Sequence, residues 1–220
     1  MHKTGKLKHL FDNSFDDTTI QSKLGKQEAE KVAKQLYAKL GYQENEYEIA
    51  SLERNLITED SCLWQVDFCK KYDDLYNWYQ CVRITFVPEI EKIKMLTLFD
   101  YDFENNPVEI SKEQAIQIAT DKATQLGKEG NRVKSITVEL EIKKMNSYVY
   151  AQENPIEPEI VEIIDENTSI YQAAHYAYRT EYIVRKVWNV KIEYISDFAS
   201  CDSYFVDCTT GEIIGGDALR

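Results

Sequence analysis

Two stretches of this 220-residue chain share one pattern: 25–41, GKQEAEKVAKQLYAKLG, and 111–127, SKEQAIQIATDKATQLG. They match at five of seventeen positions without a gap. A Trp-x-Val triplet follows each stretch, at 64–66 and at 188–190, and a further strand and turn follow each triplet. Repetition of the same elements in the same order predicts one supersecondary unit that the chain uses twice.

Both stretches have the apolar spacing of an amphipathic helix. The first helix is predicted over 26–40, with Gly41 ending it, and its apolar stripe consists of Ala29, Val32, Ala33, Leu36 and Leu40. The second is predicted over 112–126, where Ser111 and Gln114 fit a capping box. Its apolar stripe consists of Ala115, Ile118, Ala119 and Leu126.

Alternation of apolar and polar residues predicts strands after each helix. Trp64, Val66 and Phe68 alternate with Gln65 and Asp67. The run KKYDDLYNWYQ that follows contains acidic and Asn residues typical of a turn. Further strands are predicted at 81–87, 93–99, 133–142, 187–195, 204–206 and 213–214.

Composition limits the class of partner. Lys and Arg total 26 and Asp and Glu total 38, so the formal net charge is −12. Such a chain is repelled by phosphate backbones and anionic membrane surfaces, which disfavours nucleic-acid binding. No stretch approaches the roughly 20 apolar residues of a membrane span, and the first 24 residues lack the apolar run of a signal peptide. We expect an extracytoplasmic or cell-envelope location if an export segment has been removed, and otherwise a cytoplasmic one.

The chain has five cysteines, Cys62, Cys69, Cys81, Cys201 and Cys208, so at least one is unpaired in any disulfide scheme within the chain. No Cys-x-x-Cys occurs, and the chain has only three histidines, so a zinc site is not expected. Two alternatives remain. The cysteines are small buried hydrophobic side chains, or Cys69 and Cys81 form a disulfide across a hairpin in an oxidising compartment.

The second copy carries an insertion. The Trp of the triplet follows the helix-ending glycine by 23 positions in the first copy and by 61 in the second, which places about 38 extra residues at roughly 146–182. Residues 146–178 hold six acids and no Lys or Arg. Insertions of this length are usually functional or disordered. The candidate partner-binding residues there are Tyr148, Tyr150, Glu157, Glu159, Glu162, Tyr171, Tyr176 and Tyr178.

Known catalytic and cofactor motifs are missing from the sequence. No dinucleotide-binding, Walker A, nucleophile-elbow, HExxH or EF-hand pattern occurs. His2 and His9 lie in the N-terminal lead-in, where solvated histidines are expected, and His175 lies in the insertion. The sequence therefore predicts no catalytic residue, no metal ligand and no cofactor. Each Trp of a Trp-x-Val triplet alternates along a strand and is expected in the core.

The order helix, Trp-x-Val strand and closing hairpin YFVDCTTGEIIG resembles the PepSY domain family. The residues that carry the resemblance are Tyr204, Val206, Asp207, Gly211, Glu212 and Ile213. In the first copy Val87 and Ile93 match the pattern, whereas Pro88 replaces the Asp and Lys92 the Gly. The resemblance covers about 25–100 and 111–216 apart from the insertion, and it implies a helix packed on a small antiparallel sheet. It also implies a domain that binds or inhibits peptidases in the bacterial cell envelope, without catalytic residues.

We therefore predict an α+β protein with a cystatin-like architecture of two repeated units. The predicted division is a weakly ordered segment at 1–22, a first repeat at 23–104, and a second repeat at 108–220 that includes the insertion at about 146–182.

The predicted function is a non-enzymatic module that binds a protein partner, for example a peptidase that it inhibits or a protein of the cell envelope that it regulates. The alternative is a scaffold domain that forms a homodimer or docks a neighbouring domain in an envelope protein.

Overall fold

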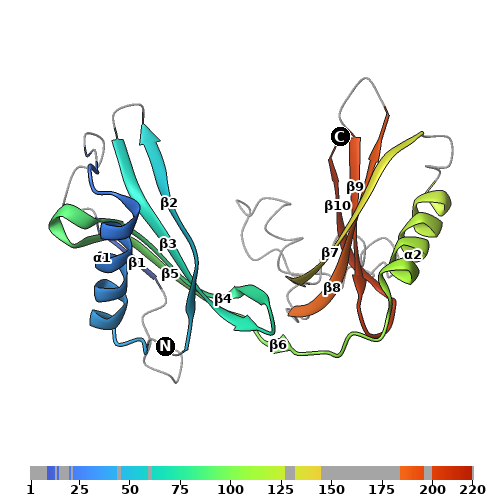
Figure 1. Ribbon diagram of the computed structural model, residues 1–220, viewed down its shortest axis with the longest axis horizontal. Helices are drawn as coiled ribbons and strands as arrows, with labels where there is room; N and C mark the ends of the chain where they lie inside the picture. Colours follow the sequence, from blue (N-terminus) through green and yellow to red (C-terminus); the bar gives the residue numbers. More distant parts are fainter. Residues whose placement is uncertain are drawn as a thin grey trace, which may run out of the picture. The chain divides into compact units, whose positions relative to one another are not determined.

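The computed structural model describes residues 9–12, 14, 20, 22–43, 46–58, 61–126, 132–144, 184–195 and 200–219. The chain divides into two compact units, Met1–Asp100 and Tyr101–Arg220. Each unit has one α-helix packed on one mainly antiparallel sheet, so the fold class is α+β, as the sequence predicts (Figure 1).

The first unit contains helix α1 (Lys26–Lys39) and a sheet with the strand order β1-β5-β4-β3-β2. Its strands are β1 (His9–Phe11), β2 (Glu48–Thr58), β3 (Ser61–Tyr72), β4 (Leu75–Val87) and β5 (Lys92–Asp100). A 3-10 turn, η1 (Pro88–Ile90), joins β4 to β5. Strand β1 lies inside the lead-in that the sequence predicts to be weakly ordered. It is ordered because β5 offers it a free edge, on which His9 to Phe11 pair antiparallel.

The second unit repeats this arrangement with helix α2 (Lys112–Gln125) and a meander of four strands. The strands are β7 (Val133–Lys144), β8 (Val184–Tyr194), β9 (Ser200–Asp207) and β10 (Ile213–Leu219). A short strand, β6 (Phe103–Glu104), pairs parallel with the first residues of β8. Strands β2 to β5 of the first unit thus correspond to β7 to β10 of the second.

Both helices pack through their predicted apolar faces. Ala29, Ala33 and Leu36 of α1 are buried against a sheet face that includes Trp64 and Val66. In α2 the buried residues are Ala115, Ala119 and Ala123. Leu126 is 48% exposed, so its predicted place in the core is wrong. It is the C-cap residue of α2, and the last buried turn of the helix is occupied by Ala123 instead.

The helix ends follow the local sequence signals. Gln114 N donates to Ser111 Oγ at 3.2 Å, and Ser111 N donates to Gln114 Oε1 at 2.8 Å, which confirms the predicted capping box. Gly41, which follows the C-cap residue Leu40 of α1, has φ +83°, a conformation that glycine adopts without a steric penalty.

The closing turns of the two units correct the sequence alignment by one residue. Trp64 lies opposite Phe86, whereas Trp188 lies opposite Val206, so Phe86 is the counterpart of Val206. Val87, and not Pro88, therefore occupies the place of Asp207. The left-handed position of the turn, held by Gly211 (φ +76°), is held in the first unit by Glu91 (φ +50°) and not by Lys92. Phe86 packs in the core under α1, and this packing sets the register. The sequence alignment pairs Val87 with Val206 because the residue types agree, and it therefore misses the register.

In both units the carbonyl of the residue before the helix cap accepts a side-chain hydrogen bond beside the triplet Trp. Trp188 Nε1 donates to the carbonyl of Ile110 at 2.7 Å. In the first unit the corresponding carbonyl, that of Leu24, accepts from Arg54 Nη2 at 3.0 Å, and the Arg54 guanidinium stands over the Trp64 ring at 5.3 Å. Arg54 thus replaces the indole N–H, and Trp64 Nε1 is buried with no hydrogen-bond partner in the described chain.

The segment before each helix also hydrogen-bonds to the strand that carries the Trp-x-Val triplet, β3 in the first unit and β8 in the second. Ile20 O accepts from Cys62 N at 2.8 Å, and Ser22 N donates to Cys62 O at 3.1 Å. In the second unit the side-chain amide of Asn106 takes the place of these two backbone groups. Its Oδ1 accepts from Lys186 N at 2.8 Å, and its Nδ2 donates to Lys186 O at 3.2 Å. The repeated unit therefore begins several residues before its helix.

Glu89 anchors the segment before α1. Its Oε1 accepts from Ser22 Oγ at 2.9 Å and from the N–H groups of Lys23 and Leu24 at 2.6 and 3.1 Å. Burial alone would raise the pKa of the Glu89 carboxyl, but hydrogen bonds from its own N–H and from these three donors outweigh burial, so the pKa is lowered.

Because the folded pKa lies below the unfolded value, the contribution of Glu89 is complete above about pH 4.3 and disappears as pH falls through the folded pKa. Glu89→Gln is expected to lower the free energy of unfolding by about 1 kcal/mol at pH 7, since the carboxylate is partly solvated. It should also weaken the loss of stability between pH 5 and pH 3. Urea unfolding across this range checks it, with Glu53→Gln, an exposed site on β2, as the control. Parallel pH profiles for the wild type and Glu89→Gln would contradict the assignment.

Candidate functional site

The partner-binding residues predicted from the sequence all fall between 145 and 183, outside the described residues. They are Tyr148, Tyr150, Glu157, Glu159, Glu162, Tyr171, Tyr176 and Tyr178. His2 and His175 also lie outside the described residues. His9, which the sequence places in a solvated lead-in, belongs to β1, where its Nδ1 lies 3.3 Å from Thr97 Oγ1.

A disulfide joins Cys69 of β3 to Cys81 of β4. The two residues are direct cross-strand partners, so the structure selects the disulfide from the two alternatives that the sequence leaves open. Both side chains are buried. Cys62, Cys201 and Cys208 are free thiols. Burial raises the pKa of the Cys208 and Cys201 thiols, which disfavours the reactive thiolate form.

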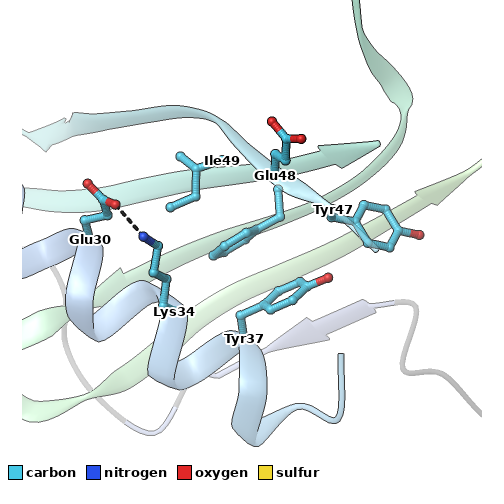
Figure 2. A pocket seen from close by; sticks show the side chains of 7 residues that line it. Glu30, Lys34, Tyr37, Tyr47, Glu48 and Ile49 are labelled. Carbon is cyan, nitrogen blue, oxygen red and sulfur yellow. Dashed lines mark hydrogen bonds and ion pairs between the residues drawn. The ribbon is translucent and has the colours of Figure 1, made fainter. Parts of the chain in front are cut away.

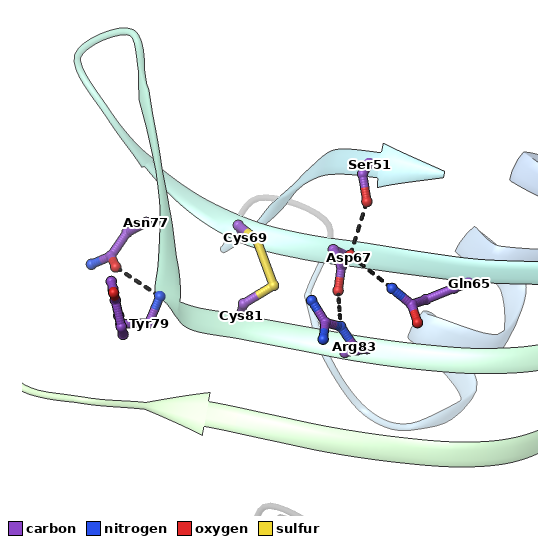
Figure 3. Close-up of a disulfide and its surroundings, with 8 residues drawn as sticks. All are labelled: Ser51, Gln65, Asp67, Cys69, Asn77, Tyr79, Cys81 and Arg83. Atoms are coloured by element: carbon purple, nitrogen blue, oxygen red, sulfur yellow. Dashed lines mark hydrogen bonds and ion pairs between the residues drawn. A yellow bond between two sulfur atoms is a disulfide. The ribbon is translucent and has the colours of Figure 1, made fainter. Parts of the chain in front are cut away.

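The disulfide marks the base of a projecting hairpin. Strand β2 pairs with β3 only as far as Cys69, and β5 pairs with β4 only as far as Gln80. Beyond those points β3 and β4 pair with each other alone among the described residues, through Lys70–Asn77, Lys71–Tyr76 and Tyr72–Leu75. We call residues 70–79 the arm. Figure 3 shows the hairpin continuing past the disulfide.

Hydrogen bonds stiffen the arm near its base. Tyr72 Oη donates to Gln80 Oε1 at 2.6 Å, and the Asn77 amide donates to the same oxygen at 3.3 Å. Asn77 Oδ1 accepts from Tyr79 N at 3.0 Å. An isolated two-stranded hairpin is marginally stable in water, so the disulfide and these bonds are what hold the arm in one conformation.

The arm presents a large apolar side chain to solvent. Trp78 is 44% exposed. Lys71, Asp73 and Asp74 are exposed as well, and Asp73 has φ +54° in the two-residue turn at the tip. Large aromatic side chains on a rigid support are the residues that dominate the energy of protein interfaces. The sequence gives the composition of this run and its turn, but it does not show that the neighbouring strands stop short of it.

A second feature of the first unit is a pocket between α1 and the start of β2. Its volume is about 320 Å³. The lining residues are Glu30, Lys34, Tyr37, Tyr47, Glu48, Ile49 and Phe68 (Figure 2). The rings of Tyr37 and Phe68 stack with centroids 4.2 Å apart, and Lys34 Nζ pairs with Glu30 Oε1 at 2.7 Å at the rim. The pocket can therefore accept an apolar or aromatic side chain.

The tyrosines around this pocket are held neutral. Burial, together with the nearby Asp100 and Glu46 carboxylates, raises the pKa of Tyr47 to about 12. Burial is also the main cause of the raised pKa values of Tyr37 and Tyr42. These hydroxyls act as hydrogen-bonding groups at neutral pH, and a tyrosinate base is disfavoured.

In the second unit a polar network surrounds Asp207, the acid of the closing hairpin. Its Oδ1 accepts from Thr209 N at 2.8 Å and Thr210 N at 3.0 Å, and its Oδ2 accepts from Arg185 Nη1 at 3.1 Å. Arg185 also pairs with Glu104 of β6 at 2.6 Å. Asp207 is fully buried. This acid therefore fixes the closing turn and the entry to β8, and it is shielded from any ligand.

The described residues show no assembled metal or membrane site. Within them, no three His, Cys, Asp or Glu side chains gather where they could hold a metal ion. Neither α-helix of that part of the chain is long and apolar enough to cross a bilayer.

Comparison with known proteins gives a likeness in structure and none in sequence. No protein-family model matches this chain, and no curated protein matches it. Among solved structures, the Bacillus megaterium YpeB C-terminal domain is similar, with a TM-score of 0.41 and 12% sequence identity. The match covers 97% of this chain and 72% of that chain.

Proposed function

We propose that this chain is a non-enzymatic protein-binding module of the PepSY type and that the arm is its partner-contacting element. The observation that carries the proposal is Trp78, a 44% exposed indole on a hairpin whose base is closed by the Cys69–Cys81 disulfide. Trp is one of the residue types that are enriched among the side chains that carry most of the binding energy of protein interfaces.

The disulfide supports the proposal in two ways. A preorganised arm loses little conformational entropy on association, so more of the contact energy appears as affinity. A stable disulfide also requires an oxidising compartment, which favours an extracytoplasmic or cell-envelope location. A peptidase that the module inhibits, or an envelope protein that it regulates, is the partner implied by the PepSY resemblance. The acidic insertion at about 146–182 would add a second contact to the same partner.

Trp78→Ala is expected to abolish partner capture without unfolding the protein, because the side chain is exposed and packs little of the core. The experiment is a pull-down from lysate and secreted fractions of the source organism. The matched control is Ile90→Ala, another exposed apolar residue (55%), which lies beyond the opposite end of β4.

Partners retained by the wild type and Ile90→Ala but lost with Trp78→Ala support the proposal. Equal retention by all three proteins contradicts the role of the arm. A concentration-dependent mass that falls with Trp78→Ala would instead identify the arm as a contact between two copies, which is the scaffold alternative.

A further inference from the structure

A row of polar residues crosses the first sheet on the face opposite α1. Each strand of the sheet contributes one residue, and each residue is the direct cross-strand partner of the next. In order across the sheet they are Ser51 of β2, Asp67 of β3, Arg83 of β4, Thr97 of β5 and His9 of β1. Their neighbours Val66, Val82 and Leu96 pack with α1. Because successive side chains of a strand point to opposite faces, the row lies on the other face. We call these five residues the polar row.

Asp67 is the buried centre of this row. Its side chain is 2% exposed. It accepts from Ser51 Oγ at 2.8 Å, from Arg83 Nε at 2.6 Å and from Gln65 Nε2 at 3.4 Å. Figure 3 shows these donors converging on its carboxylate from three sides. A carboxylate this buried is held in one orientation by its donors.

Arg83 is held by Asp67 but is far from saturated. A guanidinium has five N–H donors. Of these, only the Nε–H has an acceptor among the described residues. The guanidinium carbon stands 5.7 Å from the centroid of the Phe99 ring, and the side chain is 36% exposed. Asp67 thus fixes the Nε edge of the guanidinium, and the Phe99 ring covers one of its faces. The terminal Nη groups remain available at the surface.

The two partners are therefore unequal. Asp67 has three donors, whereas Arg83 has one acceptor. Ser51 and Gln65 hydrogen-bond to Asp67 but do not contact Arg83. They hold the Asp67 carboxylate in place, and Asp67 in turn holds Arg83.

We propose that Arg83 binds a carboxylate of an acidic peptide segment through its terminal N–H groups, with Asp67 as the positioning residue. The planar fork of an arginine matches the two oxygens of a carboxylate. Strands lie about 4.8 Å apart, so Thr97 is adjacent to Arg83 and His9 is about 10 Å from it, and both offer further polar groups along the row. The inference rests on the proposed function, for which it supplies the chemistry of the partner.

The site and the arm lie on the same part of the sheet. Cys69 and Cys81 are each two residues from Asp67 and Arg83, on the same face of the same strands. A segment whose carboxylate engages Arg83 can therefore continue past the disulfide toward the arm. This continuity favours a protein segment over a small free anion as the occupant.

The test uses the whole chain, with the Arg83 Nε–Hε signal followed by arginine-selective NMR. The probes are an acetylated, amidated tetraglutamate peptide, which has side-chain carboxylates only, and acetyl-tetraglycine, which has only a terminal carboxylate. An amidated tetraglutamine peptide is the neutral control. We expect tetraglutamate to shift the Arg83 signal and tetraglutamine to leave it unchanged. A shift with acetyl-tetraglycine alone would assign the site to a chain terminus and overturn the acidic-segment assignment.

Variants separate contact from positioning. Arg83→Gln should abolish binding, Arg83→Lys should weaken it, and Asp67→Asn should weaken it roughly tenfold while broadening the Arg83 signal. Arg54→Gln removes the same charge from β2 and should bind as the wild type does. An unchanged affinity in Arg83→Gln, or an equal loss in Arg54→Gln, overturns the inference.

The outcomes also separate this inference from the proposed function. If Trp78 is needed for partner capture but tetraglutamate leaves Arg83 unaffected, the binding function stands and the carboxylate site falls. If tetraglutamate binds at Arg83 but Trp78→Ala still captures the partner, the carboxylate site is supported and the proposed role of the arm is wrong.

Discussion

Asp207→Ala is expected to lower the free energy of unfolding of the second unit by about 3–5 kcal/mol, the range for removing one partner of a buried ion pair. The Asp207 side chain is fully buried, and that of its partner Arg185 is only 24% exposed. The substitution leaves the N–H groups of Thr209 and Thr210 without their acceptor at the closing turn. It also removes one of the two acids that hold Arg185. Burial alone would lower the pKa of Arg185, but Glu104 and Asp207 raise it on balance.

The matched control acts on the same arginine. Glu104→Gln removes the other carboxylate, which is 53% exposed, and it should cost no more than about 1 kcal/mol. Urea unfolding gives the size of each loss, and hydrogen exchange resolved by segment shows whether β8 and β9 carry it. If the two variants lose equal free energies of unfolding, the buried ion pair of Asp207 stabilises the unit no more than the exposed pair of Glu104 does, and the prediction is wrong.

Reduction of the Cys69–Cys81 disulfide is expected to lower the free energy of unfolding of the first unit by about 3 kcal/mol. The two cysteines are 12 residues apart. Opening a covalent loop of that size restores conformational entropy to the unfolded chain, which accounts for a loss of this order. Amide exchange in the arm should also accelerate on reduction, because the β3–β4 pairing and the side-chain hydrogen bonds of Tyr72, Asn77 and Gln80 then hold the arm without a covalent link.

Guanidinium unfolding with and without dithiothreitol measures this effect. Thiol titration of the unfolded protein should find three reactive cysteines before reduction and all five after it. Cys62→Ala, which removes a free thiol of the same strand, should leave the difference between oxidised and reduced protein unchanged. A midpoint that does not move on reduction would contradict the stabilising role of the bridge.

The sequence predicts the secondary structure of the repeated units well because the signals are local. The 3.6-residue spacing around Ala29 and Ala33 and the capping box at Ser111 place α1 and α2 within one residue of their observed ends. Trp64 lies in the core, as its alternating strand predicts. The predicted turn in KKYDDLYNWYQ falls at Asp73 and Asp74.

Prediction from the sequence was weaker wherever the register between distant strands matters. The alignment of the closing turns was wrong by one residue, because Phe86 and Val206 occupy the same place under their helices despite their different sizes. The anchoring of Cys62 by backbone groups and of Lys186 by the Asn106 amide has no shared sequence pattern. Such equivalences depend on which atoms meet, and different residue types can supply them.

The sequence by itself determined the duplicated α+β architecture, since hydrophobic periodicity and helix caps act within a few residues. It also determined the chemistry available to the first unit, through an aromatic hairpin and two cysteines on neighbouring strands. Only the tertiary structure decided that Ser51, Asp67, Arg83, Thr97 and His9 form one row, and that the hairpin projects beyond its neighbours. The physical reason is that a shift of one residue in strand register moves every side chain to the opposite face, and packing against α1 fixes that register.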